Sequence, residues 1–202
     1  LRHGHPGPVH DQTQAALVVR DNFRNRRTIQ RAYLQALGRA RETAFLANPY
    51  FAPGRKMRRA LEEAAMRGVK VTLLLGVGQF VMQDAVAHSF YPKLLRAGVR
   101  IVEYIHTELH AKVAVVDDKW ATVGSSNYDG LSLFVNQEAN VVVQDPAFAA
   151  YLRQEIEAGA AGGRVVHLSD FLHVPWYKRA AYGAAFLLYR TVIHIITLGK
   201  DA

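Results

Sequence analysis

Apolar residues recur along this chain with two different periods. Over residues 25–41 one helical face is apolar and the other is rich in arginine, which predicts an amphipathic helix. Its apolar positions are Ile29, Tyr33, Ala36, Leu37 and Ala40. Similar spacing predicts helices over 54–67 and 85–97, closed by Gly68 and Gly98, and a further helix over 146–157.

Short apolar runs between these helices predict strands over 45–47, 69–75, 99–104, 120–123 and 138–144, with another strand running from His110 to the turn at Asp118 and Lys119. Strands that alternate with helices indicate an α/β fold with helical layers on a sheet. The turn at Asp118 and Lys119 joins two neighbouring strands directly, which adds an antiparallel pair. We therefore expect a mixed β-sheet flanked by helices.

Candidate chemistry is concentrated in residues 110–127. On a strand, His110 and Lys112 project from one face, so an imidazole and an ammonium stand side by side. Asp117 has the opposite parity and points away from them, which favours a supporting role. Gly124, Ser125 and Asn127 form a bend of small residues that can bring neutral donors close to an anion. This combination suits a phosphodiester better than a carbonyl.

Composition narrows the classes of function. Half of the 202 residues are apolar, enough for one main domain with a real core, and no cysteine is present, which excludes disulfides and thiolate metal sites. The net charge of +8 is local: residues 20–70 carry thirteen Lys or Arg against four Asp or Glu. A basic face of this kind favours anionic lipid surfaces or nucleic acid.

The two ends of the chain differ from its middle. Residues 1–16, rich in Gly, Pro and His, are expected to be a flexible tail or linker, and the start at Leu1 suggests a fragment or a processed chain. Residues 171–202 are expected to form an amphipathic, largely hydrophobic helix that associates with membranes. Arg190 and His194 interrupt its apolar run, so a helix lying at the membrane interface is favoured over one packed on its own domain, and a tilted span comes third.

The residues His110-x-Lys112-x4-Asp117-x6-Gly124-Ser125-x-Asn127 resemble the HKD motif of the phospholipase D superfamily at every specified position. The stretches ANPYFAPG, ALEEAAMRGVKVTLLL and LLRAGVRIVEY also resemble the C-terminal half of bacterial cardiolipin synthases of the shorter type. The resemblance covers roughly residues 17–170, which it identifies as a phospholipase D-like domain.

The resemblance implies a mechanism without a metal or another cofactor. Two HKD motifs meet at one site, where one histidine forms a phosphohistidine and the other protonates the leaving alcohol. His110 can take either role, and a place in the C-terminal half favours general acid/base catalysis. Lys112 and Asn127 would hold phosphate oxygens with help from Ser125, Glu138 would bond the motif histidine and fix its tautomer, and Asp117 would brace the local fold.

The sequence contains one HKD motif, so a second must come from a missing N-terminal half or from a homodimer. The leading hypothesis is a phosphatidyltransferase that acts on phosphatidylglycerol or a similar alcohol at the cytoplasmic face of the bacterial membrane. The alternatives are a homodimeric single-motif phosphodiesterase acting on nucleic acid and an inactive membrane-binding half-domain.

Overall fold

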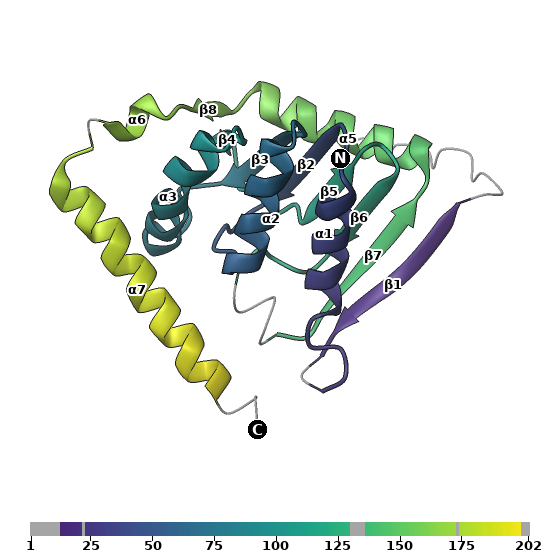
Figure 1. Ribbon diagram of the computed structural model, residues 1–202, viewed down its shortest axis with the longest axis horizontal. Coiled ribbons are helices and arrows are strands. Elements are labelled where there is room, and N and C mark those ends of the chain that lie inside the picture. The colour runs from purple at the N-terminus through teal and green to yellow at the C-terminus, as the bar shows by residue number, and fades with distance from the viewer. Residues whose placement is uncertain (1–12, 22, 130–135, 173, 199–202) are drawn as a thin grey trace.

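An eight-stranded mixed sheet forms the centre of the protein (Figure 1). The computed structural model describes residues 13–21, 23–129, 136–172 and 174–198. Along the sheet the strand order is β1-β7-β6-β5-β2-β3-β4-β8. The strands are β1 (Gln14–Arg20), β2 (Thr43–Asn48), β3 (Lys70–Gly76), β4 (Arg100–Tyr104), β5 (Val113–Val116), β6 (Trp120–Gly124), β7 (Glu138–Gln144) and β8 (Arg164–Val166).

Strands β2, β3 and β4 run parallel, and all other pairings in the sheet are antiparallel. The predicted mixed α/β sheet is therefore confirmed. Because β5 is antiparallel to β2, residues just before β5 lie beside the carboxyl end of β2. Residues just after β5 lie beside the start of β2. This arrangement puts His110 and Lys112 at the opposite end of β5 from Asp117.

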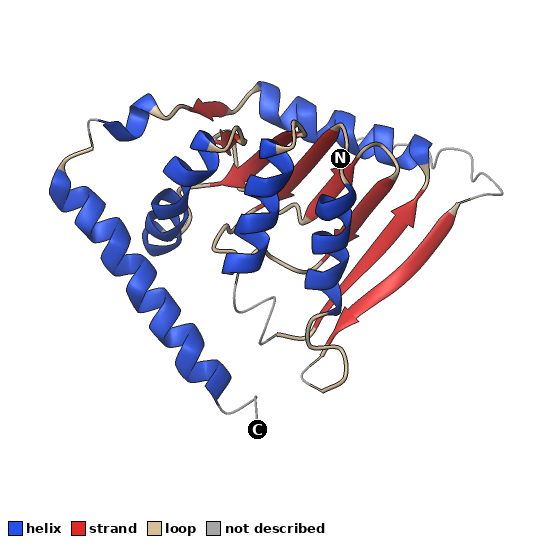
Figure 2. Cartoon of the chain, in the orientation of Figure 1, coloured by secondary structure: helices blue, strands red, loops and turns tan. Residues whose placement is uncertain are grey.

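Helices cover both faces of the sheet (Figure 2). One face carries α1 (Thr28–Arg39), α2 (Arg55–Met66) and α3 (Val81–Arg96), and α5 (Pro146–Ala161) lies on the other. The alternation of side chains produces two cores. Leu46, Leu73 and Ile101 pack on the side of α1 to α3, whereas Phe45, Leu74 and Val102 pack against α5. Central strands with both faces covered account for the continuous apolar runs.

The ends of α2 and α3 are closed by the predicted glycines. Gly68 and Gly98 have φ angles of 94° and 93°, a conformation that suits glycine best. The amide of Val69 donates to Ala64 O at 3.1 Å across the first of these turns. In contrast, α3 begins at Val81 rather than at residue 85, and it continues through Pro92.

Strand β1 lies partly within the stretch predicted to be a tail. Residues 1–12 are outside the described part of the chain, but Gln14–Arg20 pairs along its whole length with β7. The tail boundary at residue 16 is therefore too late. The alternating apolar signal of β1 is weak because the strand is at the sheet edge, where Leu17 is 69% exposed. Short β8 was also not anticipated.

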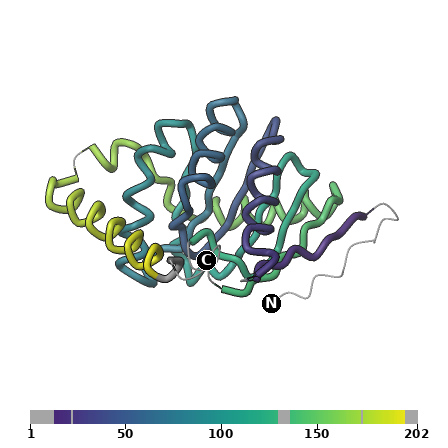
Figure 3. The backbone as a smooth tube through the Cα atoms, turned by 60° about the horizontal axis from the view of Figure 1, so that its bottom comes forward, coloured from purple at the N-terminus to yellow at the C-terminus, as the bar shows by residue number. Residues whose placement is uncertain are grey.

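The C-terminal helix α7 (Trp176–Leu198) follows the short helix α6 (Ser169–Leu172) and crosses one side of the molecule (Figure 3). Its inner side contacts α3, with the Phe186 ring centroid 5.1 Å from that of Phe90. Its outer side exposes Leu187, Leu188 and Ile195. Within the described residues, no helix combines the length and apolar character needed to cross a bilayer.

Candidate active site

His110 and Lys112 lie in an extended segment between β4 and β5, directly before β5 begins at Val113. Their side chains stand together, as the i, i+2 spacing predicts. Lys112 Nζ lies 3.1 Å from His110 Nε2 and donates to His110 O at 3.2 Å. His110 is exposed, whereas Lys112 is only 9% exposed. The imidazole can therefore meet a substrate while the ammonium is held in place beneath it.

Burial lowers the pKa of Lys112 from its usual value of 10.5, although the negative charges of Glu138 and Asp129 act in the opposite direction. The two carboxylates therefore help to keep the ammonium charged in a largely desolvated position. A fixed cation of this kind stabilises negative charge more effectively than an exposed lysine.

The bend after β6 brings the small polar residues of the motif alongside this pair. The amide of Gly124 donates to Lys112 O at 3.1 Å, so Ser125 and Asn127 follow directly beside the His110–Lys112 segment. Asn127 Oδ1 is buried and has no hydrogen-bond partner among the described residues. A buried amide oxygen that could still accept a hydrogen bond, next to a cation and an imidazole, is typical of a site that binds a polar ligand.

Two buried asparagines that the sequence analysis missed support this bend. A Cβ added to Gly124 would come within 2.2 Å of Asn140 Oδ1, so the close approach of these residues requires glycine. Asn140 Oδ1 also accepts from Ser126 N at 3.4 Å. Asn48 Oδ1 accepts from the amides of Tyr50 and Tyr128, both at 3.2 Å. The available signal was an asparagine directly next to the apolar run of each strand.

Glu138 does not occupy the position expected of it. Its carboxylate accepts hydrogen bonds from Ser125 Oγ and, at 3.4 Å, from Asn136 Nδ2. The expected bond to His110 is not formed in the described structure. Glu138 begins β7, which pairs with β6, so the bend after β6 is nearer to it than the segment before β5. Glu138 therefore contacts the motif through Ser125 and through the charge of Lys112.

Asp117 lies at the opposite end of β5 from His110. Its carboxylate accepts backbone hydrogen bonds from Arg41 and Glu42 at 2.8 Å and from Thr43 at 2.9 Å. Asp117 and Asp118 have φ angles of 53° and 47° in the turn that joins β5 to β6. Aspartate tolerates this conformation better than most residues. The geometry of Asp117 suits bracing of the start of β2, with no contact to the His110 imidazole.

The Asp117→Asn variant is expected to lower the free energy of unfolding by about 1–3 kcal/mol, because an amide NH2 group would face a backbone donor. Burial raises the pKa of Asp117, but the three N–H groups outweigh it and hold the pKa below 3.8. The stabilisation is therefore present above pH 3.8 and lost as pH falls through the lower folded-state pKa. Urea unfolding at neutral and acidic pH measures both effects.

The neighbouring Asp118→Asn variant is the matched control. Asp118 pairs with Arg153 at 2.9 Å, but its side chain is 37% exposed, so a loss below about 1 kcal/mol is expected. Equal losses of unfolding free energy in the two variants would contradict the bracing role. So would a stability difference between wild type and Asp117→Asn that stays the same in acid.

Comparison with known proteins identifies the family of this fold and motif. Residues 33–159 match the sequence profile described as "Cardiolipin synthase, PLD-like domain". The chain belongs to this phospholipase D-like family. Cardiolipin synthase B of Salmonella typhi is 42% identical over 154 residues, which are 76% of this chain and 36% of that relative. The chain thus spans about a third of the length of this curated relative.

Solved structures of more distant proteins share the fold. Nuc, a phospholipase D family member from Salmonella typhimurium, superposes with a TM-score of 0.65 at 18% identity. The match covers 77% of this chain and 99% of Nuc. The phosphatidylserine synthase of Haemophilus influenzae gives a TM-score of 0.66 at 13% identity, covering 88% of this chain and 47% of that protein. At identities of 18% and 13%, the structural similarity shows only that this chain and the two proteins share the same fold.

Proposed function

We propose that this chain supplies half of the active site of a phosphatidyltransferase, which transfers a phosphatidyl group to phosphatidylglycerol or a similar alcohol. The observation that carries the proposal is the His110–Lys112 pair, in which an imidazole nitrogen lies 3.1 Å from a buried ammonium beside a bend of small polar residues. A cation and a histidine beside a bend of small polar residues suit a phosphodiester. The relationship to cardiolipin synthases supports the choice of substrate.

The proposed reaction has two displacements at phosphorus. In the first, one histidine forms an N–P bond, the bond to the leaving alcohol breaks, and the other histidine gives that alcohol a proton. In the second, the acceptor hydroxyl loses its proton to the second histidine and attacks phosphorus, and the N–P bond breaks. Lys112, Ser125 and Asn127 would hold the non-bridging oxygens throughout. His110 can serve in either role, and we favour general acid/base catalysis.

The second histidine requires another HKD-bearing domain, from the same polypeptide or from a second copy. An exposed apolar row on the sheet is a suitable docking surface. It crosses three strands, where Leu17 pairs with Val141 and Val141 pairs with Val123. These side chains are 69%, 41% and 41% exposed, and Val123 is two residues from Ser125. A domain docked here would lie next to the bend after β6 that contains Ser125 and Asn127.

The protein is also proposed to bind the cytoplasmic face of the bacterial membrane peripherally. The exposed apolar side of α7 and the basic excess between residues 20 and 70 both suit an anionic bilayer surface. Such a position brings the site to substrates that do not leave the membrane.

An exchange assay on the full-length polypeptide that contains these residues tests the function. Vesicles of phosphatidylglycerol are expected to yield a cardiolipin-like product and one free glycerol for each transfer, and an added soluble alcohol is expected to compete as acceptor. Hydrolysis to phosphatidic acid without any transfer would overturn the transferase proposal. Cleavage of DNA by a dimer of this chain, without lipid turnover, would favour the phosphodiesterase alternative.

A further inference from the structure

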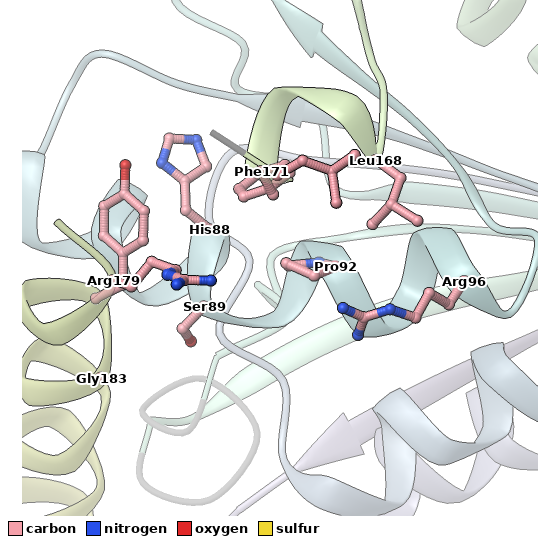
Figure 4. Close-up of a pocket in the computed structure, with 10 residues that line it drawn as sticks. His88, Ser89, Pro92, Arg96, Leu168, Phe171, Arg179 and Gly183 are labelled. Atoms are coloured by element: carbon pink, nitrogen blue, oxygen red, sulfur yellow. The ribbon is translucent and has the colours of Figure 1, made fainter. Parts of the chain in front are cut away.

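A hollow of about 310 Å³ lies between α3, α6 and α7, outside the candidate active site (Figure 4). Ser89 and Arg96 of α3 form one part of its lining, and Arg179 and Tyr182 of α7 form another. None of the residues that line it belongs to the HKD motif. Its chemistry is therefore separate from that of His110 and Lys112.

The hollow carries two cations without acidic partners. In the described part of the chain, neither the Arg96 nor the Arg179 side chain forms a hydrogen bond or an ion pair, although the side chains of Arg153 and Arg164 both do. The nearby buried acid Glu103 is already occupied, because it contacts His88 Nε2 at 2.9 Å and also binds Arg164. Figure 4 shows the guanidinium groups of Arg96 and Arg179 approaching from opposite ends, with Pro92 between them.

The remaining lining is apolar and reaches the surface. Leu168, Phe171 and Leu172 line the α6 side, and Leu172 is 65% exposed. Next to them, at the start of α7, Trp176 is 77% exposed. Tryptophan at the edge of an apolar helix face is typical of the headgroup region of a membrane. An inorganic anion would use the arginines alone, whereas a phospholipid would use both parts of the hollow.

We propose that this hollow binds the phosphate headgroup of an anionic phospholipid, at a site distinct from the catalytic one. Arg96 and Arg179 bind the phosphate by charge-assisted hydrogen bonds, and the hydroxyl of Tyr182 donates to another of its oxygens. The acyl chains run along Leu172 toward the outer side of α7. A lipid bound here would hold α7 on the bilayer surface. The inference rests on the membrane association proposed above but not on catalysis.

Co-sedimentation with vesicles tests the site. Wild-type protein is compared with the double variant Arg96→Gln/Arg179→Gln on vesicles of phosphatidylcholine with and without phosphatidylglycerol. The matched control is Arg100→Gln/Lys178→Gln, which removes the same charge from exposed neighbouring positions. The affinity of the site variant for anionic vesicles is expected to fall at least about tenfold further than that of the control. This difference measures the charge-assisted hydrogen bonds to the phosphate, because both variants lose the same general electrostatic attraction. Equal losses would show general electrostatic attraction and overturn the site.

Two further measurements identify the source of the phosphate and separate this proposal from the catalytic one. Leu172→Gln is expected to weaken binding to anionic vesicles, while competition by excess inorganic phosphate stays slight. Complete displacement of the protein from vesicles by inorganic phosphate, with Leu172→Gln unchanged, would assign the hollow to a free anion and overturn the lipid proposal. The His110→Ala variant is expected to bind vesicles as the wild type does. Vesicle binding therefore tests the lipid site even if the proposed catalytic function fails.

Discussion

Replacing His110 by alanine is expected to reduce phosphatidyl transfer by at least about a hundredfold, since a positioned histidine contributes 10²–10⁴ through proton transfer alone. A larger loss is expected if His110 is the nucleophile, because no phosphohistidine could then form on this half of the site. His110 is exposed and lies in a segment outside the strands, so its loss should leave the fold intact. Transfer rates in phosphatidylglycerol vesicles and thermal unfolding together make this measurement.

The same variant distinguishes the two roles of His110. If His110 is the general acid, a substrate with an acidic leaving group needs little protonation and should recover much of the lost rate, and a phosphohistidine on the second motif should still be trapped. If His110 is the nucleophile, neither result is expected. His167→Ala is the control, because His167 is exposed and outside the site. Full activity of His110→Ala would refute the catalytic assignment.

Periodicity predicted the central part of this fold because buried strands and amphipathic helices leave strong signals. The apolar run at β3 and the helical spacing in α2 coincide with the observed elements to within one or two residues. Strand β1 was missed for a physical reason. It is held mainly by backbone pairing with β7, and Leu17 on it is exposed, so burial leaves little trace in its sequence.

The local geometry of the motif could also be predicted, because it depends on residues close together in the chain. Alternation alone puts His110 beside Lys112 and turns Asp117 away. The partner of Glu138 could not be predicted in this way. It depends on the pairing of β6 with β7, which puts Glu138 beside Ser125 and Asn140 beneath Gly124.

The Lys112→Met variant is expected to reduce turnover by about 10²–10³, the cost of removing one preorganised charge from a phosphoryl or acyl transition state. Its folding stability should stay the same or rise. Burial lowers the pKa of Lys112, so the folded protein holds this proton less tightly than the unfolded chain. The charge therefore costs stability at neutral pH, and an apolar side chain of similar length removes that cost. Lys70→Met, at an exposed position at the start of β3, is the control.

The pH profile gives an independent measure of the same charge. The pKa of Lys112 lies below 10.5, so Lys112 loses its proton at a lower pH than an exposed lysine does. Wild-type activity should therefore begin to fall at that lower pH on the alkaline side. Lys112→Arg keeps a cation whose pKa is above about 12, so the alkaline fall should move to higher pH even if turnover drops. An unchanged alkaline limb in Lys112→Arg would mean that another group titrates there. If Lys112→Met unfolds less readily than wild type but loses activity, the buried ammonium serves phosphate chemistry and lowers the folding stability of the protein.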